Sequence, residues 1–155
     1  MRKDLGMRKG KMIAQGAHAS LKVLLDAGAI ERSEMEGGGP DGSAGGAGGK
    51  APRGIERSEM EGGGPGGQAL QFTLPLDAAL AAWLGGRFTK ICVSVDSEAE
   101  LDAVVERARA AGVPCALVVD AGHTEFHGVP TKTCCAVGPA WSDAVDAITG
   151  GLPLL

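Results

Sequence analysis

Aromatic side chains are scarce in this chain, which has three Phe, two Trp and no Tyr among its 155 residues. The core must therefore be packed mainly from aliphatic side chains and alanine, which dominate the 44% of residues that are hydrophobic. No stretch approaches the roughly 18 consecutive apolar residues of a membrane-spanning helix, and no apolar run of signal-peptide type follows the basic N-terminus. We expect a cytoplasmic protein with no membrane partner.

Cysteine is also sparse. The four cysteines, Cys92, Cys115, Cys134 and Cys135, include no CxxC pair, and each lies in an apolar, strand-like segment. This pattern is typical of buried, reduced thiols and not of a disulfide framework.

Positive charge is in deficit overall, with a net charge of −4, which argues against bulk attraction to nucleic acid. Its distribution is uneven. Residues 1–26 carry six Lys or Arg against two Asp, a balance of +4, whereas residues 69–155 carry five against ten acidic residues, a balance of −5. A polyanion would therefore be bound by one end of the molecule only.

The most informative stretch is residues 10–25, GKMIAQGAHASLKVLL, which predicts a helix with one narrow polar stripe. At about 100° per residue, Lys11, Gln15, His18 and Lys22 fall within about 60° of one another, and nearly every other position is Ala, Gly or aliphatic. Such a stripe suits a helix that is packed on most sides and directs its polar groups into a cleft. The alternative is the ordinary solvent face of a small helix.

The composition changes between residues 28 and 68. Fourteen glycines lie between residues 31 and 68, and the string IERSEMEGGGP occurs twice, at 30–40 and 55–65. Neither copy could bury an apolar face, so the duplication indicates an expanded linker and not a stacked structural repeat. We expect one domain, formed by residues 1–27 and 69–155, that is interrupted by a disordered insertion over residues 28–68.

The second part of the domain predicts an alternation of helices and strands. Strand 115–119 (CALVV) is a continuous apolar run, typical of a strand buried on both faces. A strand, a helix that begins with the capping box of Ser97 and Glu100, and this second strand predict a parallel βαβ unit with a right-handed crossover. The predicted elements are helix 76–84, strand 88–95, helix 97–111, strand 115–119, strand 132–137 and helix 141–149, and the fold class is α/β.

A candidate site follows the buried strand, because sites in parallel sheets gather where strands end. Asp120 stands there, followed by Gly122 and by the hydroxyls of Thr124, Thr131 and Thr133, which together form a plausible polar pocket. The alternative is that Asp120 only caps the turn with its own backbone.

A metal site in the same segment is the weaker interpretation. His123, Glu125 and His127 are possible ligands, with Cys134 or Cys135 nearby, but their spacing matches no zinc pattern well. The chain also has no GxSxG, Walker or GxGxxG motif. We therefore expect no metal.

Several motifs together resemble the type 2 peptidyl-tRNA hydrolases. They are MRKGKMIAQGAHA near the N-terminus, then VVDAGHTEF, the TKT strand, AVGPA and the closing ITGGLPLL, in the order in which that family has them. The resemblance covers residues 2–26 and about 88–155. The repeat-bearing insertion matches nothing in the family.

The resemblance implies hydrolysis of the ester that joins a peptide to the 3′ ribose of tRNA, with no metal or organic cofactor. It also implies a three-layer α/β/α fold with a small mixed sheet, and it favours a homodimer. The family's catalytic roles fall on Lys11, Gln15, Asp120 and Thr124. Asp120 would orient or partly deprotonate a water held by Thr124, Lys11 would stabilise the oxyanion and keep Asp120 ionised, and Gln15 would hydrogen-bond the substrate or the Lys11 amine.

Substrate binding is expected to involve basic residues of the N-terminal segment. These would hold phosphates near the acceptor end of the tRNA, while His18 would mainly support the helix and two threonines would complete the pocket. The substrate-binding candidates are Arg2, Lys3, Arg8, Lys9, His18, Lys22, Thr131 and Thr133.

Two features depart from the family pattern. Members begin with an apolar strand before the RKDL-like segment, whereas this sequence has RKDL from residue 2, so we expect the first strand of the fold to be missing; a misassigned start codon explains this better than a deletion. His123 is the second departure, and with His127 it makes this loop more titratable near neutral pH. Two other functions remain open: a truncated, non-catalytic relative that binds RNA or a partner, and a zinc hydrolase that uses His123 and His127.

Overall fold

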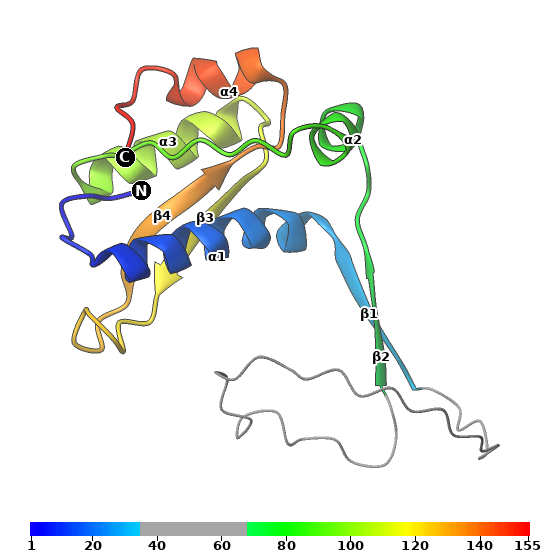
Figure 1. Cartoon of the computed structure of the whole chain (residues 1–155), viewed down its shortest axis with the longest axis horizontal. Coiled ribbons are helices and arrows are strands. Elements are labelled where there is room, and N and C mark those ends of the chain that lie inside the picture. The colour runs from blue at the N-terminus through cyan, green and yellow to red at the C-terminus, as the bar shows by residue number, and fades with distance from the viewer. Residues whose placement is uncertain (35–67) are drawn as a thin grey trace, which may run out of the picture. The chain divides into compact units, whose positions relative to one another are not determined.

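The structure is a computed structural model that describes residues 1–34 and 68–155 (Figure 1). The described chain forms two compact units, one of Met1–Ala29 with Leu74–Leu155 and one within Ile30–Thr73. The elements of the first unit are α1 (Lys9–Ala27), α2 (Ala78–Gly85), α3 (Glu98–Ala110), β3 (Cys115–Asp120), β4 (Thr131–Val137) and α4 (Ser142–Thr149), and those of the second are β1 (Ala29–Glu34) and β2 (Gln68–Thr73).

The antiparallel pair of β3 and β4 is the centre of the first unit. Leu117 lies opposite Cys135, Val118 opposite Cys134, and Asp120 opposite Thr131, with an irregularity in the register between Val118 and Val119. This register places the last residue of β3 beside the first residue of β4. The predicted polar segment is thus the loop that joins the two strands.

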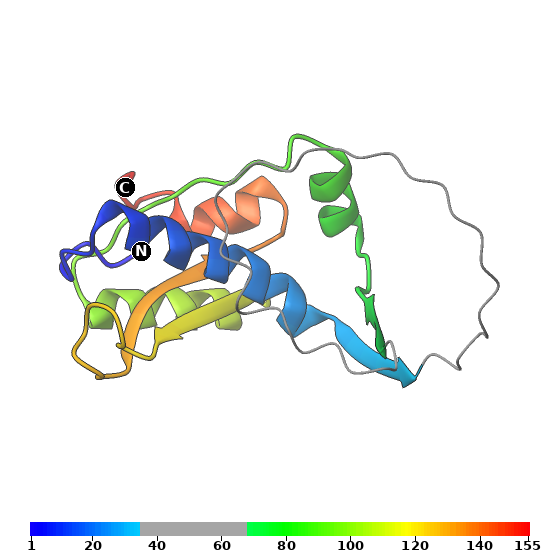
Figure 2. The ribbon, with the colours of Figure 1, turned by 60° about the horizontal axis from the view of Figure 1, so that its bottom comes forward.

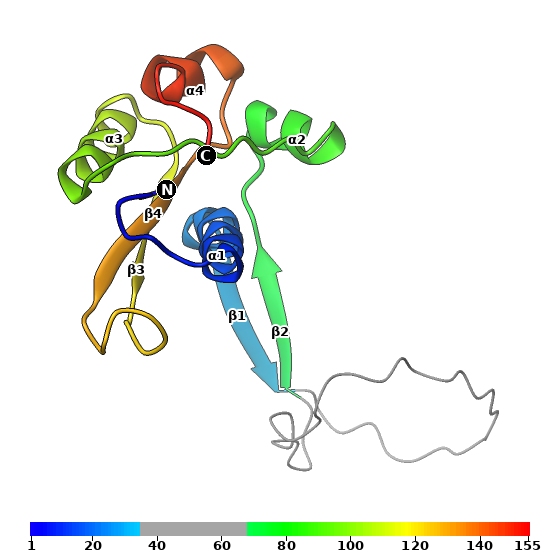
Figure 3. The ribbon, with the colours of Figure 1, turned by 60° about the vertical axis from the view of Figure 1, so that its left-hand side comes forward.

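Helices cover both faces of this strand pair. On one face, Ala19 of α1 packs against Val118 and Cys134. On the other face, Leu101 and Ala108 of α3 belong to a cluster against which alternate strand residues, Cys115, Leu117, Cys135 and Val137, also pack. Figure 3 shows α1 and α3 on opposite sides of the strands. Successive side chains of a strand point to opposite faces, so each of the two strands packs against α1 with one set of side chains and against α3 with the other.

Residues 1–3 extend the hydrogen bonding of the strand pair on the β4 side. The Arg2 amide donates to the carbonyl of Thr133 (2.9 Å), the Val95 amide donates to Met1 (2.9 Å), and the Lys3 amide donates to Val95 (3.0 Å). The segment therefore lies between β4 and Val95. The C-terminus is close by, since the Leu155 amide donates to Cys92 (3.0 Å), and Figure 1 shows the two ends together.

The predicted strand 88–95 is not a continuous strand. Its bridges are isolated ones: Val95 pairs with Arg2 in parallel and Val93 pairs with Leu154 in antiparallel fashion. The two strands of the predicted βαβ unit, 88–95 and 115–119, are not neighbours. Residues 1–3 lie between the first of them and the β3–β4 pair.

The predicted helices are confirmed, and their caps explain their boundaries. The Ser97 hydroxyl accepts from the Glu100 amide (3.2 Å), and the Glu100 carboxylate accepts from the Asp96 amide (2.8 Å), so the capping box is shifted by one residue on its return bond. Asp77 caps α2 by accepting from the Leu80 amide (2.7 Å). These local bonds satisfy amides that the first helical turn leaves free.

Two burial predictions were wrong in detail. Residues 115–119 predict a strand buried on both faces, but the Val119 side chain is exposed and belongs to neither of the two core clusters. Cys92 was expected to be a buried thiol, but it is exposed in the extended segment that lacks a ladder. All four cysteines are free.

The second unit contains a two-stranded sheet of β1 and β2. These strands lie at the two ends of the stretch in which the sequence predicts a disordered insertion, residues 28–68, and the composition did not suggest them. The repeat IERSEMEGGGP and the rest of residues 35–67 lie outside the described residues. Among the described helices, none is long and apolar enough to cross a membrane.

Candidate active site

Two distant segments meet at one end of the first unit. The first turns of α1 lie beside the loop that joins β3 to β4, as Figures 1 and 2 show from two directions. Side chains of α1 then reach Asp120 at the end of β3 and Thr124 in the loop. The meeting is therefore produced by packing of α1 on the strand pair, and not by any local sequence proximity.

Lys11 and Asp120 form a direct ion pair. The Lys11 Nζ lies 2.5 Å from the Asp120 Oδ2 and donates to the Thr124 Oγ1 at 2.9 Å. The two charged side chains are 13% and 14% exposed, so the pair is largely shielded from solvent. Three of the predicted catalytic residues are thus in contact, and no water-sized gap separates the ammonium from the carboxylate.

Gln15, one turn beyond Lys11, joins the same carboxylate to the core. Its side-chain amide donates from Nε2 to the Asp120 Oδ2 (2.7 Å), and its Oε1 accepts from the Thr133 hydroxyl (2.5 Å). Gln15 is 2% exposed and Thr133 is fully buried. Because the Thr133 hydroxyl occupies the amide oxygen, the amide nitrogen is directed toward Asp120.

The second oxygen of Asp120 also has a partner. Asp120 Oδ1 accepts from the Gly122 backbone amide at 2.9 Å, so the side chain does cap its own turn as well as meet Lys11. Gly122 has a φ of +85°, and a Cβ there would lie 2.5 Å from the Val129 carbonyl oxygen. Only glycine fits this turn, and the turn supplies the backbone amide that hydrogen-bonds the Asp120 carboxylate.

The charge state of Asp120 follows from these contacts. The hydrogen bond from Lys11 holds the pKa of the Asp120 carboxyl below its usual value, helped by the Gly122 amide and by Gln15 and opposed by burial. Asp120 is therefore an anion at neutral pH. A carboxylate of lowered pKa is a weak base, which suits a group that orients a water more than one that removes a full proton.

Phe126 is a site residue that the sequence did not reveal. The Lys11 Nζ lies 5.5 Å from the centre of its ring, a cation–π distance. The available signal was rarity, since Phe126 is one of three Phe in the chain and stands within the VVDAGHTEF motif.

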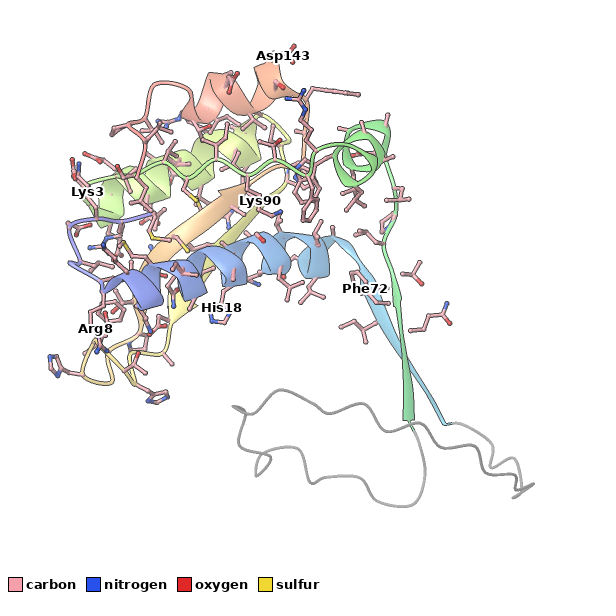
Figure 4. All side chains as sticks on the ribbon, in the orientation of Figure 1. Lys3, Arg8, His18, Phe72, Lys90 and Asp143 are labelled. Atoms are coloured by element: carbon pink, nitrogen blue, oxygen red, sulfur yellow. The ribbon has the colours of Figure 1, made fainter. Side chains whose placement is uncertain are left out.

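The predicted tRNA-binding residues differ in how exposed their side chains are and in whether their charges are already paired with carboxylates. Arg8 is 80% exposed and its Nε pairs with the Glu125 carboxylate at 2.7 Å, which lowers the pKa of Glu125. Lys9 is exposed beside it at the start of α1. Figure 4 shows Arg8 at this end of α1 and His18 projecting from its middle.

The other predicted tRNA ligands lie elsewhere. Arg2 is mostly buried between Asp4 (2.7 Å) and Glu98 (2.9 Å), and Lys3 pairs with Asp96 (3.3 Å). Lys22 pairs with Asp26 at 2.8 Å, one turn further along α1. Thr131 lies opposite Asp120 in the strand pair and donates its hydroxyl to the nearby Val129 carbonyl (2.9 Å).

The proposed metal ligands do not gather. Across residues 1–34 and 68–155, no group of three or more His, Cys, Asp or Glu side chains is placed to hold a metal ion. Glu125 instead pairs with Arg8. The chemistry available at this site is therefore that of a carboxylate, an ammonium, an amide and a hydroxyl.

An open cleft of about 510 Å³ begins at this site. Gln15 and Asp120 line its inner end, and His18, Leu21 and Leu25 of α1 line it further along, opposite Val119 of β3. The predicted polar stripe of α1 therefore faces a cleft in part, as the sequence suggested. A carbonyl group placed at the inner end would meet both a hydrogen-bond donor and a carboxylate.

Comparison with known proteins gives one consistent family. The chain matches the family described as "Peptidyl-tRNA hydrolase PTH2" over residues 1–155. It is 34% identical over 155 residues to the peptidyl-tRNA hydrolase of Methanocaldococcus jannaschii, covering 100% of this chain and 95% of the relative. The peptidyl-tRNA hydrolases of Haloquadratum walsbyi (32% identity, 99% and 93% covered) and Aeropyrum pernix (34%, 99% and 90%) are similar as well.

Proposed function

Because the chain belongs to the peptidyl-tRNA hydrolase PTH2 family, we propose that it hydrolyses the ester bond between a peptide and the 3′ ribose of tRNA. The products are a peptide with a free carboxylate and a tRNA with a free 3′ hydroxyl. The observation that carries the proposal is the position of Asp120 at one end of an open cleft, where it accepts hydrogen bonds from Lys11 and Gln15 and where Lys11 also donates to Thr124.

The proposed mechanism assigns a role to each of these groups. Asp120, ionised at neutral pH, accepts a hydrogen bond from a water and directs its lone pair toward the ester carbonyl carbon. Thr124 helps to hold that water. The water oxygen bonds to the carbonyl carbon, one water proton is transferred to the ribose 3′ oxygen, and the carbon–oxygen bond to the ribose breaks.

Lys11 stabilises the negative charge that develops on the carbonyl oxygen, and Gln15 acts through Asp120. The Lys11 ammonium has three donors, of which Asp120 and Thr124 occupy two, so one donor is free for the oxyanion. Gln15 holds the carboxylate in place through its own amide, which Thr133 orients. Phe126 supports the ammonium by its ring.

Arg8 and Lys9 are the proposed phosphate contacts, since they are exposed next to the site. The positive end of the α1 dipole adds to their attraction for phosphate. We propose that Arg2 and Lys3 act mainly on the fold through their ion pairs, and that Thr131 shapes the loop.

Several finer properties belong to the same proposal. Helices on both faces of the β3–β4 pair support a three-layer α/β/α fold, and the parallel bridge of Arg2 with Val95 beside an antiparallel pair supports a mixed sheet. The substrate and the free thiols favour the cytoplasm, and the exposed side chains of Ile91 and Leu154 favour a homodimer.

The experiment that tests the function is hydrolysis of an N-acetylaminoacyl-tRNA by the purified chain. We expect turnover by the wild type, none by Asp120→Ala, and wild-type turnover by the matched control Asp143→Ala, whose carboxylate lies on α4 away from the site (Figure 4). Circular dichroism would establish that each variant is folded. Wild-type turnover by Asp120→Ala would refute the mechanism.

A non-catalytic relative is the alternative, and the direct contact of Lys11 with Asp120 argues against it. Tight tRNA binding with a steep dependence on salt, and no cleavage, would favour that alternative.

A further inference from the structure

The lining of the cleft continues from the catalytic groups along α1. From Gln15 and Asp120 it follows α1 toward its C-terminal end, and its outer part is lined by the apolar side chains of Leu21, Leu25 and Val119. Leu21 is 56% exposed and Leu25 is 40% exposed, although both are large hydrophobic residues. Exposed apolar side chains along a cleft that starts at a reactive centre indicate a surface that binds part of the substrate.

The charges along this cleft do not suit the tRNA. Its lining contains two carboxylates, and each is already paired with an ammonium: Asp120 with Lys11 at 2.5 Å and Asp26 with Lys22 at 2.8 Å, so no positive charge is in excess there. Phosphates require an excess of positive charge, and such an excess lies at the opposite end of α1, where Arg8 and Lys9 face one carboxylate, that of Glu125, which pairs with Arg8. The two directions that lead away from Asp120 thus differ in charge and in polarity.

The substrate has the same division. At its ester, the polyanionic tRNA departs from one side of the carbonyl carbon and the peptide departs from the other. We infer that the cleft between α1 and β3 binds the peptide of the substrate, on the N-terminal side of its ester-linked residue; this inference rests on the proposed function. The carbonyl then lies at Lys11 and Asp120 with the tRNA on Arg8 and Lys9.

The length of the cleft sets the number of peptide residues that it binds. From Gln15 to Asp26 the helix rises about 16 Å, at about 1.5 Å per residue. An extended peptide covers about 3.3 Å per residue, so about five residues span the same distance. Apolar contacts from leucine and valine carry no requirement for a particular side chain, which suits an enzyme that accepts peptides of varied sequence.

The test compares substrates that share one tRNA and one ester-linked amino acid. These are an N-acetylated single residue, an N-acetylated pentapeptide and an N-acetylated decapeptide. For the wild type we expect KM to be about five- to tenfold lower for the pentapeptidyl-tRNA than for the single residue, which corresponds to about 1 to 1.4 kcal/mol. The decapeptide is expected to give no further decrease.

The variants Leu21→Ser and Leu25→Ser remove apolar surface from the cleft. We expect each to reduce the ratio of the two KM values, and the double variant to bring it close to one. Ile13→Ser is the matched control, because Ile13 is an exposed aliphatic residue of the same helix that does not line the cleft. It is expected to keep the wild-type ratio.

Two results would overturn the inference. One is a wild-type KM that does not depend on peptide length. The other is an increase in the inhibition constant of deacylated tRNA for Leu21→Ser, which would show that the cleft binds RNA. Failure of the wild type to cleave any of the three substrates would instead refute the proposed function itself, and the inference with it.

Discussion

The Lys11–Asp120 pair makes a quantitative prediction about stability. The two side chains are 13% and 14% exposed and 2.5 Å apart, so removal of one charge leaves the other in a shielded place without its counter-ion. We expect Asp120→Asn to destabilise the fold more than Lys11→Met does. After Asp120→Asn the ammonium has no counter-ion and keeps the Thr124 hydroxyl and the Phe126 ring, whereas after Lys11→Met the carboxylate keeps the two hydrogen-bond donors of Gln15 and Gly122.

The magnitudes follow from these remaining partners. Breaking a buried ion pair from one side typically costs about 3–5 kcal/mol, and the residual exposure here favours the lower end, about 3 kcal/mol for Asp120→Asn. With two donors left to the carboxylate, Lys11→Met should cost about 1–2 kcal/mol. The double variant removes both charges, so its loss should be smaller than the sum of the single losses by about 1.5–3 kcal/mol.

Urea unfolding of the four proteins at pH 7 measures this double-mutant cycle. Hydrolysis assays on the same proteins should show that each single variant and the double variant lose activity to a similar extent, because the two groups act as a unit. Stability losses that add within about 0.5 kcal/mol would mean that the pair makes no energetic contact, and the reasoning about the site would then be wrong.

Four further predictions follow from other contacts of the site. Because the pKa of Asp120 is lowered in the folded protein, its ionised form stabilises the fold above the usual carboxyl pKa of about 3.9. This stabilisation is lost as the pH falls through the pKa of Asp120 in the folded state. Thermal unfolding should therefore show that acid destabilises the wild type more steeply than Asp120→Asn between about pH 5 and 2. Thr133→Val leaves the buried Gln15 Oε1 without its hydrogen-bond donor, so it should lower the free energy of unfolding by about 1–3 kcal/mol and also lower kcat. The control Thr149→Val removes a hydroxyl hydrogen bond within α4 and should leave kcat unchanged. Gly122→Ala should destabilise more than Gly128→Ala in thermal unfolding, because both positions have positive φ (+85° and +78°) but only at Gly122 would a Cβ clash with the Val129 backbone. Arg8→Ala should raise KM and reduce the salt slope of tRNA affinity by about one, whereas Arg109→Ala, on α3 at the opposite face, should change neither.

Local signals in the sequence predicted the helices and the β3–β4 strands well. The polar stripe of α1 and the capping residues Ser97 and Asp77 act within a few residues of the structure they determine, so the pattern contains the information. The strand predicted over residues 88–95 fails for the opposite reason. Its pairing depends on residues 1–3 and on Leu154, which are remote in sequence, so no local pattern contains it. The same non-local dependence hides the pairing of β1 with β2 across the insertion.

The residues of the candidate site also divide into those with a local signal in the sequence and those that depend on the tertiary structure. Lys11, Gln15, Asp120 and Thr124 could be named from motifs, and their contacts agree with that choice. The sequence placed Lys22 and Arg2 among the basic residues near the tRNA, but charge alone does not tell which cations are already paired within the fold. The partners Asp26 and Asp4 are themselves local and could have been considered, whereas Glu98 is joined to Arg2 only by the tertiary structure.

Gln15 shows why the site and the core depend on each other. Its backbone carbonyl accepts from the Cys134 thiol at 3.3 Å, its side-chain oxygen is held by Thr133, and its side-chain nitrogen holds Asp120. The fully buried Thr133 and the buried Cys134 are adjacent in β4, so the strand that forms the core also sets the direction of the amide that orients the carboxylate. A shift of β4 relative to α1 would therefore turn the Gln15 side-chain amide away from Asp120. The precision of the reactive centre thus depends on packing between α1 and β4, and substitutions of Ala19 or Cys134 should alter kcat through Gln15 without touching the substrate.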